Sequence, residues 1–312
     1  MKTELPPLQR IAEVFPYLAE QYTSLTHITN THAPVVLRGE SGTGKSLLAQ
    51  CIHDDSARAT FRCTKRNLSQ IPNDLLPSEL FGHMHGSFSG SRRNRIGLIE
   101  HCNQGTLIIE DFTEMSPLAQ AMLLQFLDDR TIYRVGENEP RSIDVRIIVT
   151  TNKDVHEAIE TRHLREDLWF RLSVGHEFTL PPLCDIPGCH LKSVLAQMVK
   201  NVRESEPQFG CNGHFEIDDA VLEYAALHVR GNFRGLLKLA HHIALIDAEH
   251  IGFHQLPDWL RSTGDIPAHV WKQMKRDERK KCAPQILASH NGNISQAALS
   301  LGISRSTFQH YL

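Results

Sequence analysis

With 312 residues, the chain is long enough for about two or three domains that each bury a core. Hydrophobic residues make up 41% of it and charged residues 22%, but no apolar run approaches the roughly 18 residues of a membrane span, and the N-terminal residues show no signal-peptide pattern. The net charge is −3, and the seven scattered cysteines favour reduced thiols in a cytoplasm over a disulfide framework.

Residues 1–180 alternate strand-like and helix-like segments, which is the pattern of a parallel sheet covered by helices. Three short, β-branched and continuous apolar runs are predicted to be its buried strands. They are Val35–Leu37, Leu107–Ile109 and Val145–Thr150. We therefore expect an α/β fold for this part of the chain.

A phosphate-binding loop follows the first strand. The sequence GESGTGKS fits G-x-x-x-x-G-K-[ST] without a mismatch and precedes a predicted helix at Leu47–Ile52. In such a loop the backbone N–H groups point at phosphate oxygens, Lys45 reaches the β- and γ-phosphates, and Ser46 ligates Mg²⁺. The loop comprises Gly39, Glu40, Ser41, Gly42, Thr43, Gly44, Lys45 and Ser46. The sequence thus predicts binding of a nucleoside triphosphate.

Polar groups end the other two predicted strands. The second strand runs directly into Glu110 and Asp111, and a phosphate loop needs such carboxylates for Mg²⁺ and for the attacking water. We assign the metal to Ser46 and Glu110. The third strand ends in Thr151 and Asn152, which we expect to sense the γ-phosphate or to orient water.

Pro181-Pro182 ends the α/β block, and the following residues have a helical pattern up to about His254. Helices are expected at Leu191–Val202, Asp218–His228 and Phe233–Ala248. A group of Pro and Gly residues after this block marks a linker.

The last segment is basic and is predicted to bind DNA. From Trp271 to Leu312 there are seven Lys/Arg against two Asp/Glu. A helix at Ile294–Leu301, a turn at Gly302 and a helix over Arg305–Leu312 have the spacing of a helix-turn-helix, and the basic helix before them favours DNA over a hairpin packed on the preceding domain. The residues expected to face DNA are Ser304, Arg305, Ser306, Thr307, Gln309 and His310.

These motifs, in this order, resemble the AAA+ activators of sigma-54 RNA polymerase, the bacterial enhancer-binding proteins, over nearly the whole chain. Residues 39–45 read GESGTGK as in that family, and residues 79–91 read ELFGHMHGSFSGS where the family has ELFGHxxGAFTGA. Residues 105–111 read GTLIIED for GTLFLDE, and residues 164–172 read LREDLWFRL for FREDLYYRL. The helix-turn-helix resembles the family's Fis-type module.

The resemblance implies an AAA+ α/β subdomain at 1–180, a helical lid at 181–255, a linker at 256–270 and a DNA-binding domain at 271–312. It also implies an ATPase that uses ATP and Mg²⁺, assembles into a ring that is usually a hexamer, binds enhancer-type DNA and remodels sigma-54 polymerase to activate transcription.

The resemblance also assigns roles to single residues. Thr151 and Asn152 match the first sensor, and Arg234 matches the second sensor, on the lid. Arg165 and Arg171 match the arginines that complete the neighbouring subunit's nucleotide site. The loop that touches sigma-54 consists of Gly86, Ser87, Phe88, Ser89, Gly90 and Ser91.

Departures from the family pattern leave questions open. Glu110 and Asp111 stand in reversed order, which withdraws the expected general base by one methylene, and a misplacement of about 1 Å can cost on the order of 100-fold in rate. An Asn that links the nucleotide state to the sigma-54 loop fits either Asn67 or the position of Lys65, depending on the direction of counting. The lid motif has Gly235 where Glu is usual.

Two alternative functions therefore remain. One is a DNA-binding regulator that binds ATP without hydrolysing it and acts as a repressor or anti-activator. The other is an inactive subunit of a mixed ring. Because the phosphate loop begins at Gly39, we expect no receiver domain in front of it, and control by the protein's abundance or by a separate regulatory protein.

Overall fold

The computed structural model describes residues 18, 21–29, 31–88, 91–205, 216–246, 250–261, 266, 268–274 and 276–312. Its contacts divide the chain into two compact units, Met1–Pro181 (unit 1) and Pro182–Leu312 (unit 2). In the described part of the chain, no helix is long and apolar enough to cross a membrane.

Unit 1 is built on a five-stranded parallel sheet with the order β2-β5-β8-β1-β9. Its strands are β1 (Val35–Arg38), β2 (Cys63–Asn67), β5 (Thr106–Glu110), β8 (Arg146–Thr151) and β9 (His176–Thr179). The three strands predicted from the sequence are the central ones. The two edge strands, β2 and β9, were not predicted. Because all five strands are parallel, their carboxyl ends share one edge of the sheet.

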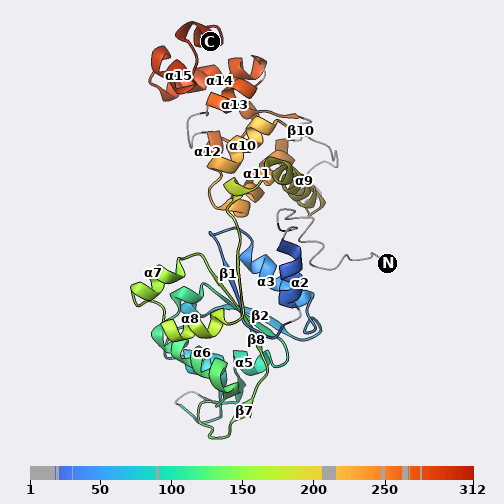
Figure 1. The fold of residues 1–312 in the computed structure, drawn as a ribbon, viewed down its shortest axis with the longest axis vertical. Coiled ribbons are helices and arrows are strands. Elements are labelled where there is room, and N and C mark those ends of the chain that lie inside the picture. Colours follow the sequence, from blue (N-terminus) through green and yellow to red (C-terminus); the bar gives the residue numbers. More distant parts are fainter. Residues whose placement is uncertain are drawn as a thin grey trace, which may run out of the picture. The chain divides into compact units, whose positions relative to one another are not determined.

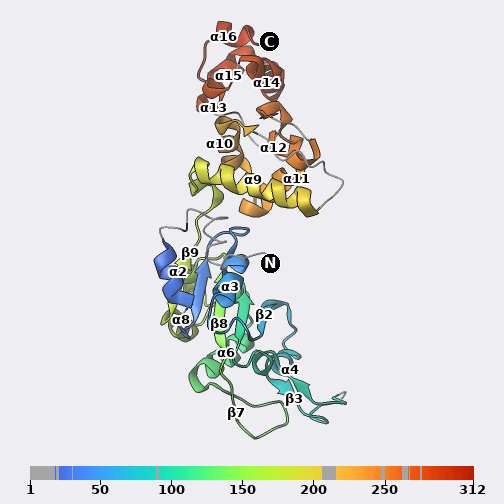
Figure 2. The same ribbon diagram turned by 90° about the vertical axis from the view of Figure 1, so that its right-hand side faces the viewer.

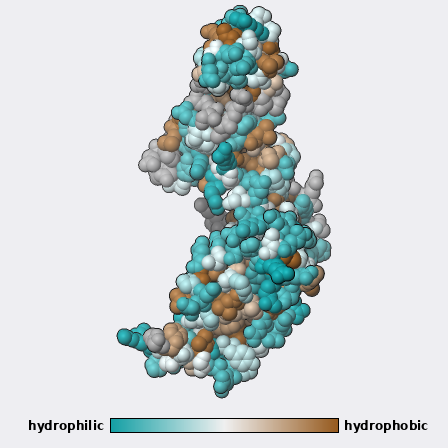
Figure 3. Space-filling model, turned by 90° about the vertical axis from the view of Figure 1, so that its left-hand side faces the viewer, coloured by the Kyte–Doolittle hydropathy of each residue, from teal (hydrophilic) through white to brown (hydrophobic). Residues whose placement is uncertain are grey.

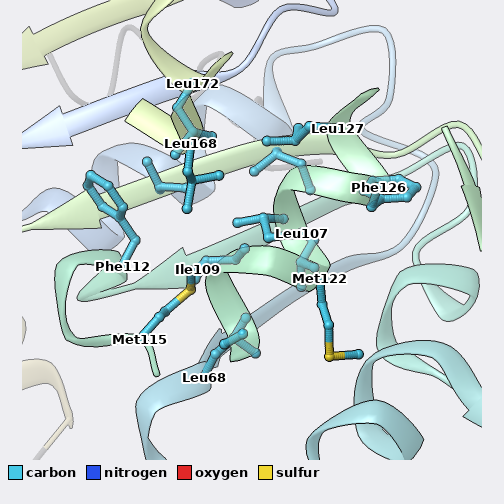
Figure 4. Packing of buried hydrophobic residues seen from close by; sticks show 14 of the residues in the cluster. Leu68, Leu107, Ile109, Phe112, Met115, Met122, Phe126, Leu127, Leu168 and Leu172 are labelled. Carbon is cyan, nitrogen blue, oxygen red and sulfur yellow. The ribbon is translucent and has the colours of Figure 1, made fainter. Parts of the chain in front are cut away.

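Helices cover both faces of this sheet (Figure 1). Helices α2 (Tyr22–Thr29) and α3 (Lys45–Asp54) lie on one side, and α6 (Pro117–Asp129) and α8 (Glu166–Ser173) lie on the other. Alternate residues of the strands serve the two faces, as the period of two requires. Thus Leu107 and Ile109 belong to the hydrophobic cluster shared with α6 and α8, which Figure 4 shows from close by.

Unit 1 also contains several shorter helices and strands outside the main sheet. Helices α4 (Leu76–Phe81), α5 (Leu98–His101) and α7 (Val155–Glu160) join the main ones, with 3₁₀ turns η2 (Leu68–Gln70) and η3 (Phe112–Glu114). Two antiparallel pairs, β3 (Gly82–His83) with β4 (Arg95–Ile96) and β6 (Thr131–Ile132) with β7 (Arg141–Ser142), lie at the same end of the unit (Figure 2). The Val135 carbonyl accepts a hydrogen bond from the Met84 backbone N–H at 3.0 Å, which joins the two pairs.

Unit 2 begins with a helical subregion. Its elements are η4 (Leu183–Asp185), α9 (Gly188–Ser205), β10 (Glu216–Ile217), α10 (Asp219–His228), α11 (Asn232–Ile246), β11 (His250–Ile251), η5 (Phe253–Gln255) and α12 (Asp258–Arg261). Strands β10 and β11 form a short parallel pair. Helix α12 falls inside the 256–270 segment that the sequence marks as a linker.

Four helices close unit 2: α13 (Ala268–Gln273), α14 (Arg276–Ser289), α15 (Ile294–Ser300) and α16 (Arg305–Gln309). The last helix was predicted to run to Leu312, but it ends at Gln309, after which the Tyr311 backbone N–H bonds back only three residues, to the Phe308 carbonyl. The predicted fold class, a parallel α/β sheet followed by helices and a C-terminal helix-turn-helix, is confirmed.

Candidate functional site

The phosphate-loop residues lie between β1 and α3, at the carboxyl edge of the sheet. Gly39, Gly42 and Gly44 have φ angles of +142°, +82° and +97°, which side chains other than glycine rarely allow. A Cβ at Gly39 would also lie 2.7 Å from the Leu180 carbonyl oxygen. The glycines therefore let the backbone curl at the N-terminus of α3, whose free N–H groups carry partial positive charge.

Lys45 is the first residue of α3, and its side chain is only 8% exposed. Its ammonium donates hydrogen bonds to the carbonyl oxygens of Gly39 at 2.8 Å and Glu40 at 2.7 Å. The buried positive charge is thereby compensated by the loop itself. The arrangement holds an ammonium inside the curl of the loop, where phosphate oxygens would bind.

The two predicted magnesium ligands touch one another. The Ser46 hydroxyl donates a hydrogen bond to Glu110 Oε1, at the end of β5. The ammonium of Lys65 on β2 lies 3.9 Å from the same oxygen, and the Glu110 side chain is 29% exposed. A hydroxyl and a carboxylate are hard oxygen ligands, so this donor set suits Mg²⁺.

The second acid has a partner on the edge strand. Asn67, the last residue of β2, donates a hydrogen bond from Nδ2 to Asp111 Oδ2 at 3.2 Å. Lys65 instead approaches Glu110, so the two alternatives left open by motif counting contact different acids. Asp111 has a left-handed backbone, with φ at 50°, and Asp is enriched there relative to longer residues such as Glu.

The pair at the end of β8 separates into a buried and an exposed member. Thr151 is fully buried; its hydroxyl is 2.8 Å from that of Thr113 and accepts a hydrogen bond from the Lys153 backbone N–H. Asn152 is exposed at the carboxyl edge of the sheet. Sequence reasoning missed Thr113, which carries no motif signal because it lies in the 3₁₀ turn after Asp111.

Arg165 and Arg171 lie at the surface, before and within α8. The guanidinium of Arg165 pairs with Asp167 at 2.7 Å and that of Arg171 pairs with Asp128. Their side chains are 48% and 49% exposed. The hydrogen bond from Arg165 lowers the pKa of Asp167 below its usual value. Both arginines are thus accessible to a second molecule.

The segment between β3 and β4 folds back on itself. The Gly86 N–H donates to the Ser91 carbonyl at 2.9 Å, and the Ser91 hydroxyl donates to the Met84 carbonyl at 2.7 Å. The ring of Phe88 meets His83 edge-on, with centroids 4.9 Å apart, and remains 43% exposed. Ser87 lies against Gly136. Two residues of the predicted sigma-54 loop, Ser89 and Gly90, lie outside the described residues.

Arg234 is exposed in the first turn of α11. The turn before it is fixed by Asn232, whose side-chain oxygen accepts a hydrogen bond from the Leu183 N–H at 2.7 Å. A Cβ at Gly235 would lie 2.3 Å from the Arg230 carbonyl oxygen, so this backbone requires glycine where the resembled family has Glu.

The C-terminal helices have a buried core and a polar exposed face. Phe308 and Leu301 are fully buried, while the predicted DNA-facing residues of and around α16 are exposed. The Ser304 hydroxyl caps α16 by accepting the Thr307 N–H at 3.1 Å, and His310 Nε2 lies 2.6 Å from an Arg276 nitrogen. The mixture of polar and apolar surface is not confined to these helices: on the side of the whole molecule that Figure 3 draws, hydrophilic surface surrounds separate hydrophobic patches.

Comparisons with known proteins indicate the same family over most of the chain. Residues 12–176 match the model of the Sigma-54 interaction domain, and residues 284–310 match that of the bacterial regulatory protein Fis family. Regulatory protein AtoC of Escherichia coli K12 is 35% identical over 297 residues, which cover 91% of this chain and 63% of AtoC. Transcriptional regulatory protein ZraR of Klebsiella oxytoca is 32% identical over 303 residues, or 94% of this chain and 66% of ZraR. The chain spans less than two thirds of either relative.

Among solved structures, the crystal structure of NtrX from Brucella abortus in complex with ATP superposes with a TM-score of 0.67. It is 23% identical, and the match covers 95% of this chain and 66% of that one. At this identity the likeness concerns the fold alone.

Proposed function

Since this chain belongs to the family defined by the sigma-54 interaction domain, we propose that it is a DNA-binding AAA+ ATPase that activates transcription by remodelling sigma-54 RNA polymerase. The observation that carries the proposal is the cluster at the carboxyl edge of the sheet. It brings the Lys45 ammonium into the curl of the loop and joins Ser46 to Glu110.

The residues of this cluster suit ATP and Mg²⁺. The loop N–H groups and Lys45 would bind the β- and γ-phosphates, and Ser46 and Glu110 would hold Mg²⁺, which neutralises charge on the phosphates when bound. Asp111, oriented by Asn67, is the group best placed to take a proton from the attacking water. Asn152 is the exposed member of the first sensor pair and would contact the γ-phosphate or the water.

We infer that the active form is a ring, with a hexamer as the expected size. The half-exposed guanidiniums of Arg165 and Arg171 are available to a neighbouring subunit, where they would neutralise charge on the transferred phosphoryl group. Arg234 would serve as the second sensor. The exposed Phe88 and its loop are the proposed contact with sigma-54, and α16 is the proposed contact with DNA in the cytoplasm.

One observation favours the alternative of an ATP-binding regulator without hydrolysis. Asp111 is one methylene shorter than the family's Glu, and its carboxylate is already hydrogen-bonded to Asn67. The same hydrogen bond supports an inactive subunit of a mixed ring when it is combined with a second observation, the exposure of Arg165 and Arg171, which could still complete an active neighbour's site.

ATP turnover measured as a function of protein concentration tests the proposal. We expect turnover per subunit to rise steeply as rings form, and transcription by sigma-54 polymerase to start from a promoter that carries the protein's binding site. A protein without turnover at ring-forming concentrations, even with promoter DNA, refutes the ATPase assignment and leaves the ATP-binding regulator.

A further inference from the structure

The edge strand β2 supplies a separate polar partner to each of the two acids. Lys65 and Asn67 are two residues apart, so their side chains lie on the same face of the strand. In the register of the sheet, Lys65 is opposite Ile108 and Asn67 is opposite Glu110. The Lys65 ammonium lies 3.9 Å from Glu110 Oε1, and the Asn67 amide lies 3.2 Å from Asp111 Oδ2. The environment of Glu110 therefore includes the positive charge of Lys65.

We propose that the Lys65 ammonium competes with a divalent cation for the Glu110 carboxylate and so lowers the affinity of the site for the cation. This inference rests on the proposed function. Lys65 pulls the Glu110 carboxylate toward β2, and its charge opposes that of the arriving cation.

Two contacts converge on one oxygen atom. Glu110 Oε1 accepts the Ser46 hydroxyl and also faces the Lys65 ammonium. A lysine is a compact charge on a flexible four-carbon stem, so it can withdraw when a cation binds, whereas the hydroxyl of Ser46 can ligate the cation directly. Ser46 thus orients Glu110 whether or not Lys65 is present. The net effect of Lys65 on the cation is consequently repulsion.

The size of the effect follows from exposure. The Lys65 side chain is 50% exposed, so solvent and salt screen its charge, and the contribution is modest rather than decisive. A doubly charged cation nevertheless feels twice the repulsion of a single charge. Removing the ammonium should therefore strengthen cation binding by about fivefold at low salt.

The test measures cation affinity rather than activity. The full chain, in excess over a fluorescent, non-hydrolysable ATP analogue, is titrated with Mg²⁺ after EDTA treatment, and the ratio of the parent's half-saturating Mg²⁺ concentration to the variant's reports the relative cation affinity. We expect Lys65→Met to raise this ratio about fivefold, and the increase to shrink in high salt.

Two control variants separate charge from structure. Lys65→Arg keeps the positive charge and should retain the parent ratio. Lys192→Met removes an equally exposed, ion-paired lysine from unit 2 (49% against 50%), and it should also leave the ratio unchanged. An unchanged or lowered ratio in Lys65→Met overturns the inference, as does an increase that salt does not affect. A parent protein that binds no nucleotide overturns the proposed function and this inference together.

Discussion

The nucleotide end of unit 1 and the helix-turn-helix of unit 2 present their predicted functional residues in opposite ways. In unit 1 these side chains bond to the protein itself: Lys45 to loop carbonyls, Ser46 to Glu110, and Asn67 to Asp111. In unit 2 the polar side chains of α16 are exposed around a buried Phe308. A substitution in the first region breaks an internal network, whereas one in the second would remove a proposed contact to DNA. We therefore expect loss of function to be concentrated in a few residues at the nucleotide end of unit 1 (the concentrated region). In the helix-turn-helix of unit 2 it should be distributed over several residues (the distributed region).

The strongest test of the concentrated region is Lys45→Ala. It removes the one ammonium held inside the phosphate loop, and we expect nucleotide binding to be lost. Binding of a fluorescent ATP analogue measures this, with Lys192→Ala as a control for the loss of one lysine. If Lys45→Ala binds ATP as tightly as the parent, the loop is not the nucleotide site and the contrast between the two regions does not hold.

Arg171→Ala asks whether the network extends into a second subunit. We expect turnover to fall by roughly 10³ with nearly unchanged ATP affinity, because the guanidinium would act on the neighbour's phosphoryl group. Asp128→Asn is the matched control, since it breaks the same ion pair but keeps the arginine. Turnover per subunit that stays constant on dilution to monomers would show that the site is not shared.

In the distributed region, Arg305→Ala should weaken the complex with the specific DNA site by about 1–3 kcal/mol if the arginine reads a guanine. Nucleotide binding should not change, because α16 (Arg305–Gln309) contains none of the proposed nucleotide-binding residues. Electrophoretic mobility shifts at several salt concentrations measure the loss. A chain that ends near Gly264 should lose specific DNA binding altogether, and its retention there would exclude the helix-turn-helix as the DNA-binding element.

The last of these tests concerns the order of the acids. Exchanging them, with Glu110→Asp and Asp111→Glu, restores the family's order and should raise turnover about tenfold if the general base regains its reach. The same change places Glu at a backbone φ of 50°, so we expect a lower melting temperature. A turnover that falls instead would mean that the site has re-formed around the reversed pair, with Asn67 matched to the shorter Asp111.

The sequence predicted the centre of the sheet better than its edges, for a physical reason. Strands β1, β5 and β8 are buried on both faces, so each contains a continuous apolar run that stands out. Strand β2 reads CTKRN and β9 reads HEFT, with mostly exposed or half-buried side chains. Edge strands need no such apolar run, and only their pairing identifies them.

Sequence patterns likewise predicted one part of the candidate site and missed another. The phosphate loop and the two acids follow from local motifs, whereas the partners of the acids come from β2, whose register no motif reveals. Counting along the chain could not choose between Asn67 and Lys65, and the acids that they contact depend on the pairing of β2 with β5, which places Asn67 opposite Glu110. No alternation of polar and apolar residues marks this segment, since Arg66 between Lys65 and Asn67 is also charged, so the two positions gain meaning only once β2 is a strand.

The outer position of β9 also has a consequence for how the protein is made. In the sheet Val35 pairs with His176, so unit 1 cannot complete its sheet until nearly its whole length has left the ribosome. Such non-local pairing slows folding, and until β9 arrives the apolar β1 has an open edge on which chains can aggregate. The C-terminal helices differ, since Trp271 packs near Phe308 and Tyr311 over a short stretch of chain. We expect unit 1 to be the part that depends on chaperones during synthesis.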